Sequence, residues 1–426
     1  MTSTPGKQLD DDAFEIGADA LDQLDNDPFE QFNKAMGAEG DANPYPSFAD
    51  ARREGGIRCD VSGFTEWEGT GDHLDAMNLF TAFSYEAVQS VLGDTQNFSS
   101  KGYEEIMGVV FGHSILEMDG DEHHHYRSMI QQAFTRGEME RWETELVGPL
   151  VARLIDAFIE DGKVDLVRNL LFPFPLMVIA ELMGLPAQDF PKFHRLAVEL
   201  IGVTVDWDRA LEASARLGEY FKTLIDERRD GDGKDLISVL ACVQEGGEFL
   251  TDDEIFAFLR LMLPAGAETT YRSSSNLMFG LLSNPEQLAA LRADRSLLPA
   301  AIEEGIRWEP PLLIIARSAL ADTVVCGTDV PASSTVILNI GSANHDETRW
   351  DDPETFNIFR ARKPHIGFAH GPHVCLGMHL ARMETRAVIN ALLDRLPDLR
   401  FDAEADAPYI AGMTFRAPPR LDVAWG

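Results

Sequence analysis

The sequence predicts a mainly α-helical fold with small β-sheets, and three observations support this expectation. Apolar residues recur at helical spacing along most of the chain. Alternating, β-branched stretches are short and few, and they lie at 322–340 and 420–425. The chain has 426 residues, 45% of them hydrophobic, which is enough to bury a large core.

Helical periodicity defines the expected helices in chain order. These cover 148–162, 176–186, 210–229, 251–284, 285–294, 298–310 and 380–397. Several begin with Thr, Asp or Pro at capping positions, and "TDDE" at 251–254 fits a capping box.

No repeat, low-complexity stretch or long linker divides the sequence. We therefore expect one domain over 44–426. A variable acidic tail is expected over 1–43, with one amphipathic helix within residues 1–40.

Charge limits the classes of partner. The chain has 71 acidic and 36 basic residues, a formal net charge of −35. Nucleic acids and anionic membranes would repel such a protein, so neither is expected as a partner. A well-solvated acidic surface is the simplest interpretation of this composition.

Cysteine usage and the N-terminus indicate the compartment. Cys59, Cys242, Cys326 and Cys375 lie far apart and form no CxxC pair. This pattern argues against a disulfide framework or a zinc cluster. The first residues have neither a basic region followed by an apolar run nor a segment that could span a bilayer. A cytoplasmic protein is expected.

The stretch "FAHGPHVCLG", residues 368–377, places Cys375 among glycines before an expected helix. The partial positive charge of a helix N-terminus stabilises an anion, and thiolate is the form of cysteine that binds metal. No second ligand at metal spacing lies nearby, so haem is the simplest cofactor that this cysteine could serve. The residues alone leave a buried, inert cysteine as the alternative.

The stretch "AGAETT", residues 265–270, lies in the middle of the longest apolar helical pattern. Glycine costs about 1 kcal/mol inside a helix, and a carboxylate in apolar surroundings costs more unless it is paired. Pro264 removes one backbone donor, and Thr269 can bond a carbonyl one turn back. A local distortion of the helix is predicted here. The alternative is an ordinary Thr/Glu pair on a helix surface.

The first of these stretches resembles the signature F-x-x-G-x-x-x-C-x-G of the cytochrome P450 family. Phe368, Gly371, Cys375 and Gly377 occupy its fixed positions. The resemblance implies that Cys375 is the axial thiolate ligand of haem b, that Phe368 packs beside the sulfur and that His373 reaches a haem propionate. Ala369 departs from the family, which commonly has glycine or serine there.

Other motifs of this family follow in the expected order. "AGAETT" is similar to A-G-x-[DE]-T-[TS]. Ala265 and Gly266 would then form the groove for dioxygen, and Glu268 and Thr269 would be the catalytic acid and alcohol that deliver protons.

The pair Glu304 and Arg307 in "EEGIR" resembles the family's E-x-x-R motif, with Arg360 as its third member. The resemblance implies a buried structural role, and a surface ion pair is the alternative.

A fourth segment supports cofactor binding. "MDGDEHHHYR" at 118–127 resembles the family pattern MDPPEHxxxR, with glycine and aspartate in place of the two prolines. His123 and Arg127 would point at propionates, and Arg317 matches a further propionate-binding arginine. The three consecutive histidines are not expected to bind zinc, because no partner cluster accompanies them.

The resemblance runs from about residue 44 to the C-terminus. It implies a triangular helical domain with a small β-rich lobe, and a monooxygenase that inserts one atom of dioxygen into a C–H bond, most simply by hydroxylation. Electrons would come from a separate ferredoxin with its reductase, and the protein would be a monomer. A peroxide-using haem-thiolate enzyme and a non-catalytic haem sensor are the alternatives; peroxide users characteristically lack the acid/alcohol pair.

The substrate and the docking surface are less constrained. An apolar pocket would suit a hydrophobic molecule, with a terpenoid or alicyclic compound preferred over a steroid, fatty acid or alkylarene. Its expected lining is Leu261, Met262, Leu313, Ile314, Ile315, Met413, Thr414 and Phe415. The ferredoxin would meet a locally basic patch, for which the candidates are Arg362, Lys363, His370 and Arg382.

Overall fold

The computed structural model describes residues 43–59, 78–204, 206–229, 231–245 and 247–426. The helix expected within residues 1–40 lies outside the described residues. The α-helices are α3 (Tyr45–Gly55), α5 (Tyr85–Gly93), α6 (Val109–Phe111), α7 (Gly120–Gln131), α8 (Arg136–Trp142), α9 (Gly148–Asp156), α10 (Pro173–Leu182), α11 (Phe190–Ile201), α12 (Trp207–Arg228), α13 (Leu236–Cys242), α14 (Asp252–Met262), α15 (Thr269–Ser283), α16 (Pro285–Ala293), α17 (Leu298–Trp308), α18 (Ile340–Asn344) and α19 (Met378–Arg395).

The helix expected over 251–284 forms the axis of the molecule. It consists of α14, a π-helical segment η9 (Leu263–Glu268) and α15. Thr251 and Glu254 close the predicted capping box at its start. The predicted distortion is confirmed, because η9 contains Pro264 and ends where Thr269 begins α15.

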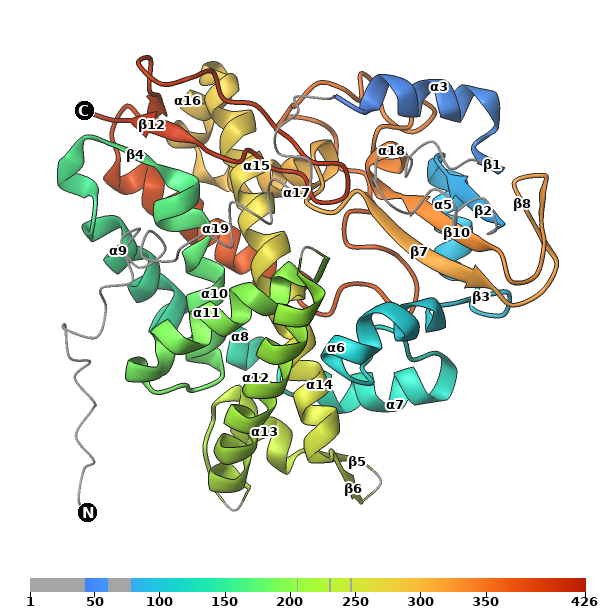
Figure 1. The fold of residues 1–426 in the computed structure, drawn as a ribbon. Coiled ribbons are helices and arrows are strands. Elements are labelled where there is room, and N and C mark those ends of the chain that lie inside the picture. The colour runs from blue at the N-terminus through green and yellow to red at the C-terminus, as the bar shows by residue number, and fades with distance from the viewer. Residues whose placement is uncertain (1–42, 60–77, 205, 230, 246) are drawn as a thin grey trace.

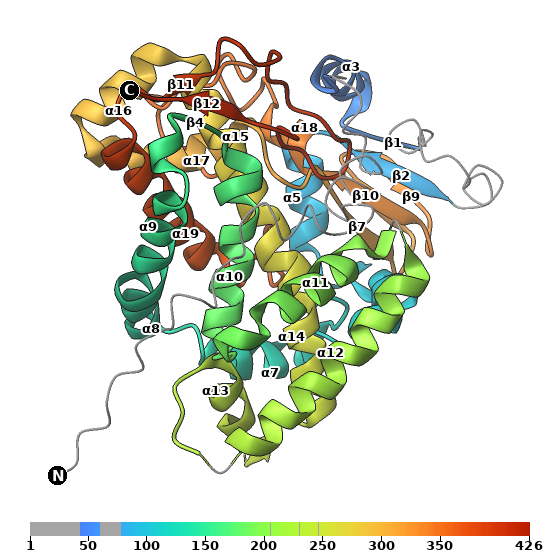
Figure 2. The ribbon, with the colours of Figure 1, turned by 60° about the vertical axis from the view of Figure 1, so that its left-hand side comes forward.

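Helices surround this axis on several sides. Figures 1 and 2 show α14 and α15, in yellow, running through the middle of the fold, with α10, α11 and α12 along one side and α19 crossing behind. α10 and α11 contact η9, α12 contacts α14, and α17 and α19 contact α15. The main apolar core lies between these helices.

The strands gather mainly beside the helices, where Figure 1 shows the sheet next to α3, α5 and α18. The five-stranded sheet has the order β1 (Ile57–Cys59), β2 (Leu79–Ala82), β10 (Thr335–Asn339), β7 (Ile314–Ala319) and β3 (Phe98–Ser99). β2 and β10 are parallel, and the other pairs are antiparallel. The expected mainly helical fold with small sheets is confirmed.

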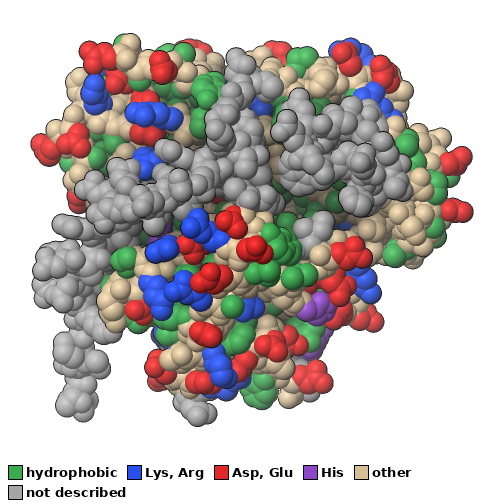
Figure 3. All heavy atoms as spheres, in the orientation of Figure 1, with side chains coloured by type: hydrophobic (Ala, Val, Ile, Leu, Met, Phe, Trp, Pro, Cys, Tyr) green, Lys and Arg blue, Asp and Glu red, His purple; other side chains and the backbone are tan. Residues whose placement is uncertain are grey.

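The remaining strands form small sheets that close the fold. β4 (Lys163–Asp165) and β11 (Arg400–Phe401) flank β12 (Asp422–Ala424), which ties the chain end to the segment after α9. β5 (Gln244–Glu245) pairs with β6 (Glu248–Phe249), and β8 (Thr323–Val325) pairs with β9 (Thr328–Val330). The space-filling view in Figure 3 shows acidic side chains spread over the visible face among fewer basic ones. Among the described residues, no helix is both long enough and apolar enough to span a membrane.

Candidate active site

The segment 366–377 forms a tight loop directly before α19. The amide of Cys375 donates to the carbonyl oxygen of Phe368 (3.0 Å), and the amide of Val374 donates to that of Gly371 (3.1 Å). Gly371 has φ +74°, and a Cβ on it would overlap the carbonyl oxygen of Leu92 at the end of α5. Only glycine fits this conformation and this close approach.

The departure from the family signature has a structural consequence. Ala369 adopts φ +62°, a left-handed conformation in which an L side chain crowds the backbone. Its amide donates to the carbonyl oxygen of Ile366 (2.8 Å), so the turn is kept at the cost of local strain. Glycine would adopt the same conformation without that strain.

Cys375 lies at the end of the 366–377 loop, two residues before Gly377, with its side chain exposed. The surrounding protein nonetheless raises the pKa of the Cys375 thiol by desolvation, against the backbone amide of Gly377 and the charges of Arg127 and Arg382, which lower it. The amide and the two cations offset part of this desolvation, and the net effect on the Cys375 thiol is a raised pKa.

The distorted segment of the central helix supplies the other expected functional residues. Thr269 Oγ1 donates to the carbonyl oxygen of Ala265 at 2.8 Å, the contact expected one turn back. Ala265 is exposed and Gly266 and Thr269 are half-buried, although the flanking Leu263 is buried. This face of an otherwise buried helix therefore borders open space.

Glu268 is buried, with 1% of its surface exposed, and it pairs with an arginine that the sequence analysis missed. Arg272 Nε donates to Glu268 Oε1 at 2.6 Å, and Nη2 lies 2.5 Å from the same oxygen. Oε2 has no hydrogen-bond partner among the described residues. Burial raises the pKa of Glu268, while the charge of Arg272 opposes the rise. The i,i+4 spacing in "ETTYR" was the available signal for this pair.

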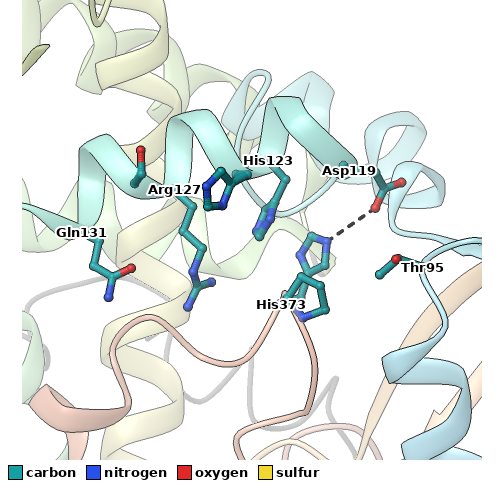
Figure 4. Close-up of a pocket in the computed structure, with 10 residues that line it drawn as sticks. Thr95, Asp119, His123, Arg127, Gln131 and His373 are labelled. Atoms are coloured by element: carbon teal, nitrogen blue, oxygen red, sulfur yellow. Dashed lines mark ion pairs between the residues drawn. The ribbon is translucent and has the colours of Figure 1, made fainter. Parts of the chain in front are cut away.

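A cluster of cationic and titratable side chains lies beside the Cys375 loop. Figure 4 shows His123 and Arg127 extending from α7 toward His373 of the loop. The ring centroids of His123 and His373 are 4.1 Å apart. Arg127 Nη2 donates to the carbonyl oxygen of Val374 at 2.6 Å. These residues line a cavity of about 340 Å³. Arg317, on β7, is buried, and its Nη1 donates to the carbonyl oxygen of Ala316 at 2.7 Å.

His373 has polar partners that sequence reasoning did not identify. Its Nε2 lies 3.2 Å from Ser100 Oγ and 3.5 Å from Asp119 Oδ1, the contact drawn as a dashed line in Figure 4. Asp119, the second residue of the "MD" that precedes α7, is thus an acid that faces the Cys375 loop.

The electrostatics of this cluster fit an anionic group. Burial, His123 and Arg317 lower the pKa of His373 to about 4. Burial and the charge of Arg127 lower the pKa of His123, whose Nε2 has no hydrogen-bond partner among the described residues. Bound carboxylates would relieve this mutual repulsion. The donor set therefore fits the propionates of a haem whose iron meets the Cys375 thiol.

The E-x-x-R pair is buried, and it forms a network with the third expected member. Arg307 Nε and Nη2 lie 2.9 and 2.8 Å from the two carboxylate oxygens of Glu304, and Arg360 Nε lies 3.1 Å from Oε1. Arg307 also donates to carbonyl oxygens of residues 344, 353 and 355. The network joins α17 to the irregular segment before the Cys375 loop.

Two residues expected in the substrate pocket are in the core instead. Leu313 is fully buried against Tyr45, Phe48 and Phe83, because the start of β7 packs under α3. Met262 is buried in the main core, on the side of α14 that packs against its neighbours. The other six residues expected to line the pocket are half-buried: Leu261, Ile314, Ile315, Met413, Thr414 and Phe415.

The candidate docking patch also requires a correction. Arg362, Lys363 and His370 are exposed. Arg382 is half-buried and forms a bidentate ion pair with Glu303, at 2.6 and 2.8 Å, because α17 packs against α19. Its charge is neutralised, so Arg382 is a poor contributor to a basic patch.

Comparisons with known proteins identify the family. A family model described as "Cytochrome P450" matches residues 204–397. The cytochrome P450 monooxygenase PikC of Streptomyces venezuelae is 34% identical over 405 residues, which cover 92% of this chain and 93% of that protein. A steroid C26-monooxygenase of Mycolicibacterium smegmatis is 34% identical over 359 residues, which cover 82% of this chain and 88% of that protein.

Solved structures agree with the sequence relatives. CYP109E1 of Bacillus megaterium in complex with testosterone matches with a TM-score of 0.81 and 28% identity, covering 90% of this chain and 100% of that chain. CYP109B1 of Bacillus subtilis matches with a TM-score of 0.78 and 29% identity, covering 90% and 100%. The chain belongs to the cytochrome P450 family of haem-thiolate monooxygenases.

Proposed function

We propose that this protein hydroxylates a hydrophobic small molecule with one oxygen atom of dioxygen, using haem b and electrons from a separate ferredoxin and ferredoxin reductase. The observation that carries the proposal is the exposed Cys375 thiol beside the half-buried Arg127 and the buried Arg317, neither of which forms an ion pair with a described carboxylate. One domain over 44–426 performs the reaction, as a cytoplasmic monomer.

The loop and the cation cluster hold the cofactor. Cys375 would ligate the iron, with Phe368 beside its sulfur, and Gly371 and Gly377 would let the loop backbone approach the haem. His123, Arg127, Arg317 and His373 would hold the propionates. When bound, the haem supplies the chemistry that activates dioxygen.

Glu268 and Thr269, where η9 meets α15 in the central helix, would hold and transfer protons. Because Arg272 holds Oε1 of Glu268, Oε2 is the oxygen that can exchange a proton through water. The Thr269 hydroxyl donates to Ala265 in the resting arrangement, and it must turn from that carbonyl to donate into the site.

The deciding measurement is the carbon monoxide difference spectrum of the dithionite-reduced, haem-loaded protein. Wild type should show the long-wavelength Soret band of a thiolate-ligated haem, and Cys375→Ser should lose it. Cys59→Ser, an exposed cysteine on β1, should keep the band and serves as the matched control. A wild type that binds haem without this band refutes the thiolate assignment and the proposed reaction.

The two alternatives are tested by the same preparations. A peroxide-using enzyme would turn over with hydrogen peroxide as fast as with ferredoxin, which the Glu268 and Thr269 pair disfavours. A non-catalytic sensor would reduce and bind carbon monoxide but form no product with any substrate class.

The substrate class proposed is terpenoid or alicyclic, with steroids, fatty acids and alkylarenes as alternatives. Half-buried apolar side chains at 261, 314, 315, 413 and 415 support a hydrophobic ligand. One relative is a steroid C26-monooxygenase, which supports steroids among these alternatives. Displacement of the ferric Soret band by long-chain acids only, in a titration with all four classes, would refute the alicyclic preference.

Arg362, Lys363 and His370 are proposed as the docking patch for the acidic ferredoxin. Arg362→Glu with Lys363→Glu should slow reduction and remove its salt dependence, because electrostatic steering sets the association rate. Arg216→Glu with Lys222→Glu, two exposed residues of α12, is the control of equal charge change. An unchanged rate and salt dependence in the double variant would reject the patch.

A further inference from the structure

Arg260 lies where three elements of the helical part meet. It occupies the last turn of α14, and its Nε donates to the carbonyl oxygen of Ser214 on α12 at 3.2 Å. Gly218, one turn further along α12, leaves room for the guanidinium, because a Cβ there would overlap Nη2. The end of α6 approaches from the third side: Gly112 lies beside Nη1, and Ser214 Oγ donates to the carbonyl oxygen of Val110 at 2.5 Å.

The guanidinium of Arg260, a half-buried residue, lacks the carboxylate partner that three buried arginines of this protein have. Arg272, Arg307 and Arg416 each pair with a buried glutamate at 2.5–2.9 Å. Arg260 forms no ion pair with any described carboxylate, in a chain with twice as many acidic as basic residues. Burial lowers the pKa of Arg260, and the only charge that opposes this is Asp253, an exposed residue two turns earlier on α14.

The half-buried Arg127 and the buried Arg317 share this lack of an ion pair. Arg127 and Arg317 also have pKa values lowered by burial. Arg127 donates to the carbonyl oxygen of Val374, and Arg317 donates to that of Ala316 and also bonds the side chain of Tyr103. These two are the arginines that are proposed above to bind haem propionates. Arg292 shares this pattern while bonding the carbonyl oxygens of Leu393 and Leu396, so a missing carboxylate points to an anion only together with the position of the arginine in the fold.

Arg260 lies on the same partly exposed face of the central helix as Ala265 and Thr269. Arg260, Leu261, Pro264 and Ala265 keep exposed surface, whereas Leu259 and Leu263 between and beside them are buried. The partly exposed stripe continues to Thr269. A regular α-helix would advance about 13 Å over the nine residues from Arg260 to Thr269, and the π-helical segment η9 shortens this distance.

We propose that Arg260 binds the carboxylate of the substrate, so that the protein oxidises a hydrophobic carboxylic acid at a carbon remote from its acid group. This inference rests on the proposed monooxygenase function and narrows its substrate class to acids, terpenoid or alicyclic acids among them. The helix geometry sets the distance between the carboxylate and the oxidised carbon at roughly 10–15 Å. The rest of the ligand remains apolar, as the pocket requires.

The experiment compares acids with their methyl esters on the haem-loaded, full-length protein at pH 8, where carboxylic acids are ionised. The probes are dodecanoic acid and lithocholic acid, each with its methyl ester, and binding is measured by equilibrium dialysis and by the Soret shift. Wild type should bind at least one acid about ten- to hundredfold more tightly than its ester, the range for a charge-assisted hydrogen bond.

Variants assign the preference to Arg260. Arg260→Gln should remove the preference for the acid and leave ester binding unchanged, and Arg260→Lys should keep part of it. Gly218→Ala keeps the charge but displaces the guanidinium, so it should weaken acid binding even if Arg260→Gln fails to fold. Arg216→Gln, an exposed arginine of α12 that pairs with Glu212, should leave both affinities unchanged.

The inference is overturned if wild type prefers neither acid to its ester, or if the preference survives in both Arg260→Gln and Gly218→Ala. The carbon monoxide difference spectrum of the same preparations separates the two proposals. A normal thiolate band without acid preference rejects the role of Arg260 alone, whereas loss of the band rejects the proposed function itself.

Discussion

The buried ion pair between Glu268 and Arg272 gives the most quantitative prediction. Arg272→Gln removes the cation and leaves a carboxylate that is 1% exposed, with the Tyr271 hydroxyl 3.4 Å from Oε1 and no described hydrogen-bond partner at Oε2. Breaking a buried pair in this way costs about 3–5 kcal/mol of unfolding free energy. Over 426 residues, an unfolding entropy of about 2.1 cal/mol/K per residue converts this cost into a fall in Tm of roughly 3–6 °C.

The pH dependence of this effect has a defined sign. Burial already raises the folded-state pKa of Glu268 above its ordinary value, and removing Arg272 raises it further. The folded state therefore binds more protons than the unfolded state above the ordinary glutamate pKa, so its stability falls as pH rises. Arg272→Gln should cost less stability at pH 5.5 than at pH 8.

The assay is urea unfolding of the haem-loaded protein at both pH values, in a double-mutant cycle with Glu268→Gln. The double variant should be more stable than the sum of the single changes predicts, by about 1–3 kcal/mol, because neither side chain is then left charged and unpaired. Arg216→Gln, an exposed paired arginine, should change the unfolding free energy by less than about 0.5 kcal/mol. A cost below about 1 kcal/mol for Arg272→Gln, or one that grows as pH falls, would refute the reasoning.

Three further predictions concern the framework of the site. Gly371→Ala should abolish the thiolate Soret band, since its Cβ would overlap the carbonyl oxygen of Leu92 and displace the Cys375 loop; a normal band would contradict the need for glycine there. Ala369→Gly should raise the unfolding free energy by up to about 1 kcal/mol by relieving φ +62°, as urea unfolding would measure, and a loss of stability would show that the turn is unstrained. Glu304→Gln should cost about 3–5 kcal/mol, because it leaves two arginines without their carboxylate, and calorimetry that finds less than about 1 kcal/mol would reject the network as a structural element.

The local parts of the site could be predicted from the sequence because they depend on short-range geometry. The spacing around Cys375 specifies a glycine turn before a helix, and Pro264 with Thr269 indicates a helix that departs from regular bonding. Glu304 and Arg307 are three residues apart, so their pairing within one helix follows from the helical repeat. The pair between Glu268 and Arg272 was equally available at i,i+4 spacing.

The tertiary structure alone decided which long-range contacts these local units make. Asp119 and His373 are far apart in sequence and meet because α7 lies against the Cys375 loop. Leu313 has the same apolar character as Ile314, yet packing under α3 buries the first and leaves the second partly exposed. Hydrophobic periodicity predicts which face of an element is buried, but it does not predict which neighbouring element covers that face.

The charged residues show most clearly the difference between what the sequence determines and what the tertiary structure decides. Composition establishes the acidic surplus of the chain, and no pattern in it distinguishes Arg382, which Glu303 neutralises, from Arg260, which has no carboxylate within ion-pair distance among the described residues. The difference arises because α17 brings an acid to one arginine, whereas α12 brings the other a backbone carbonyl and a glycine. The sequence by itself determined the elements and the chemical groups on them, and the packing of those elements decided which charges remain for a ligand, because electrostatic pairing depends on distances that only the assembled fold defines.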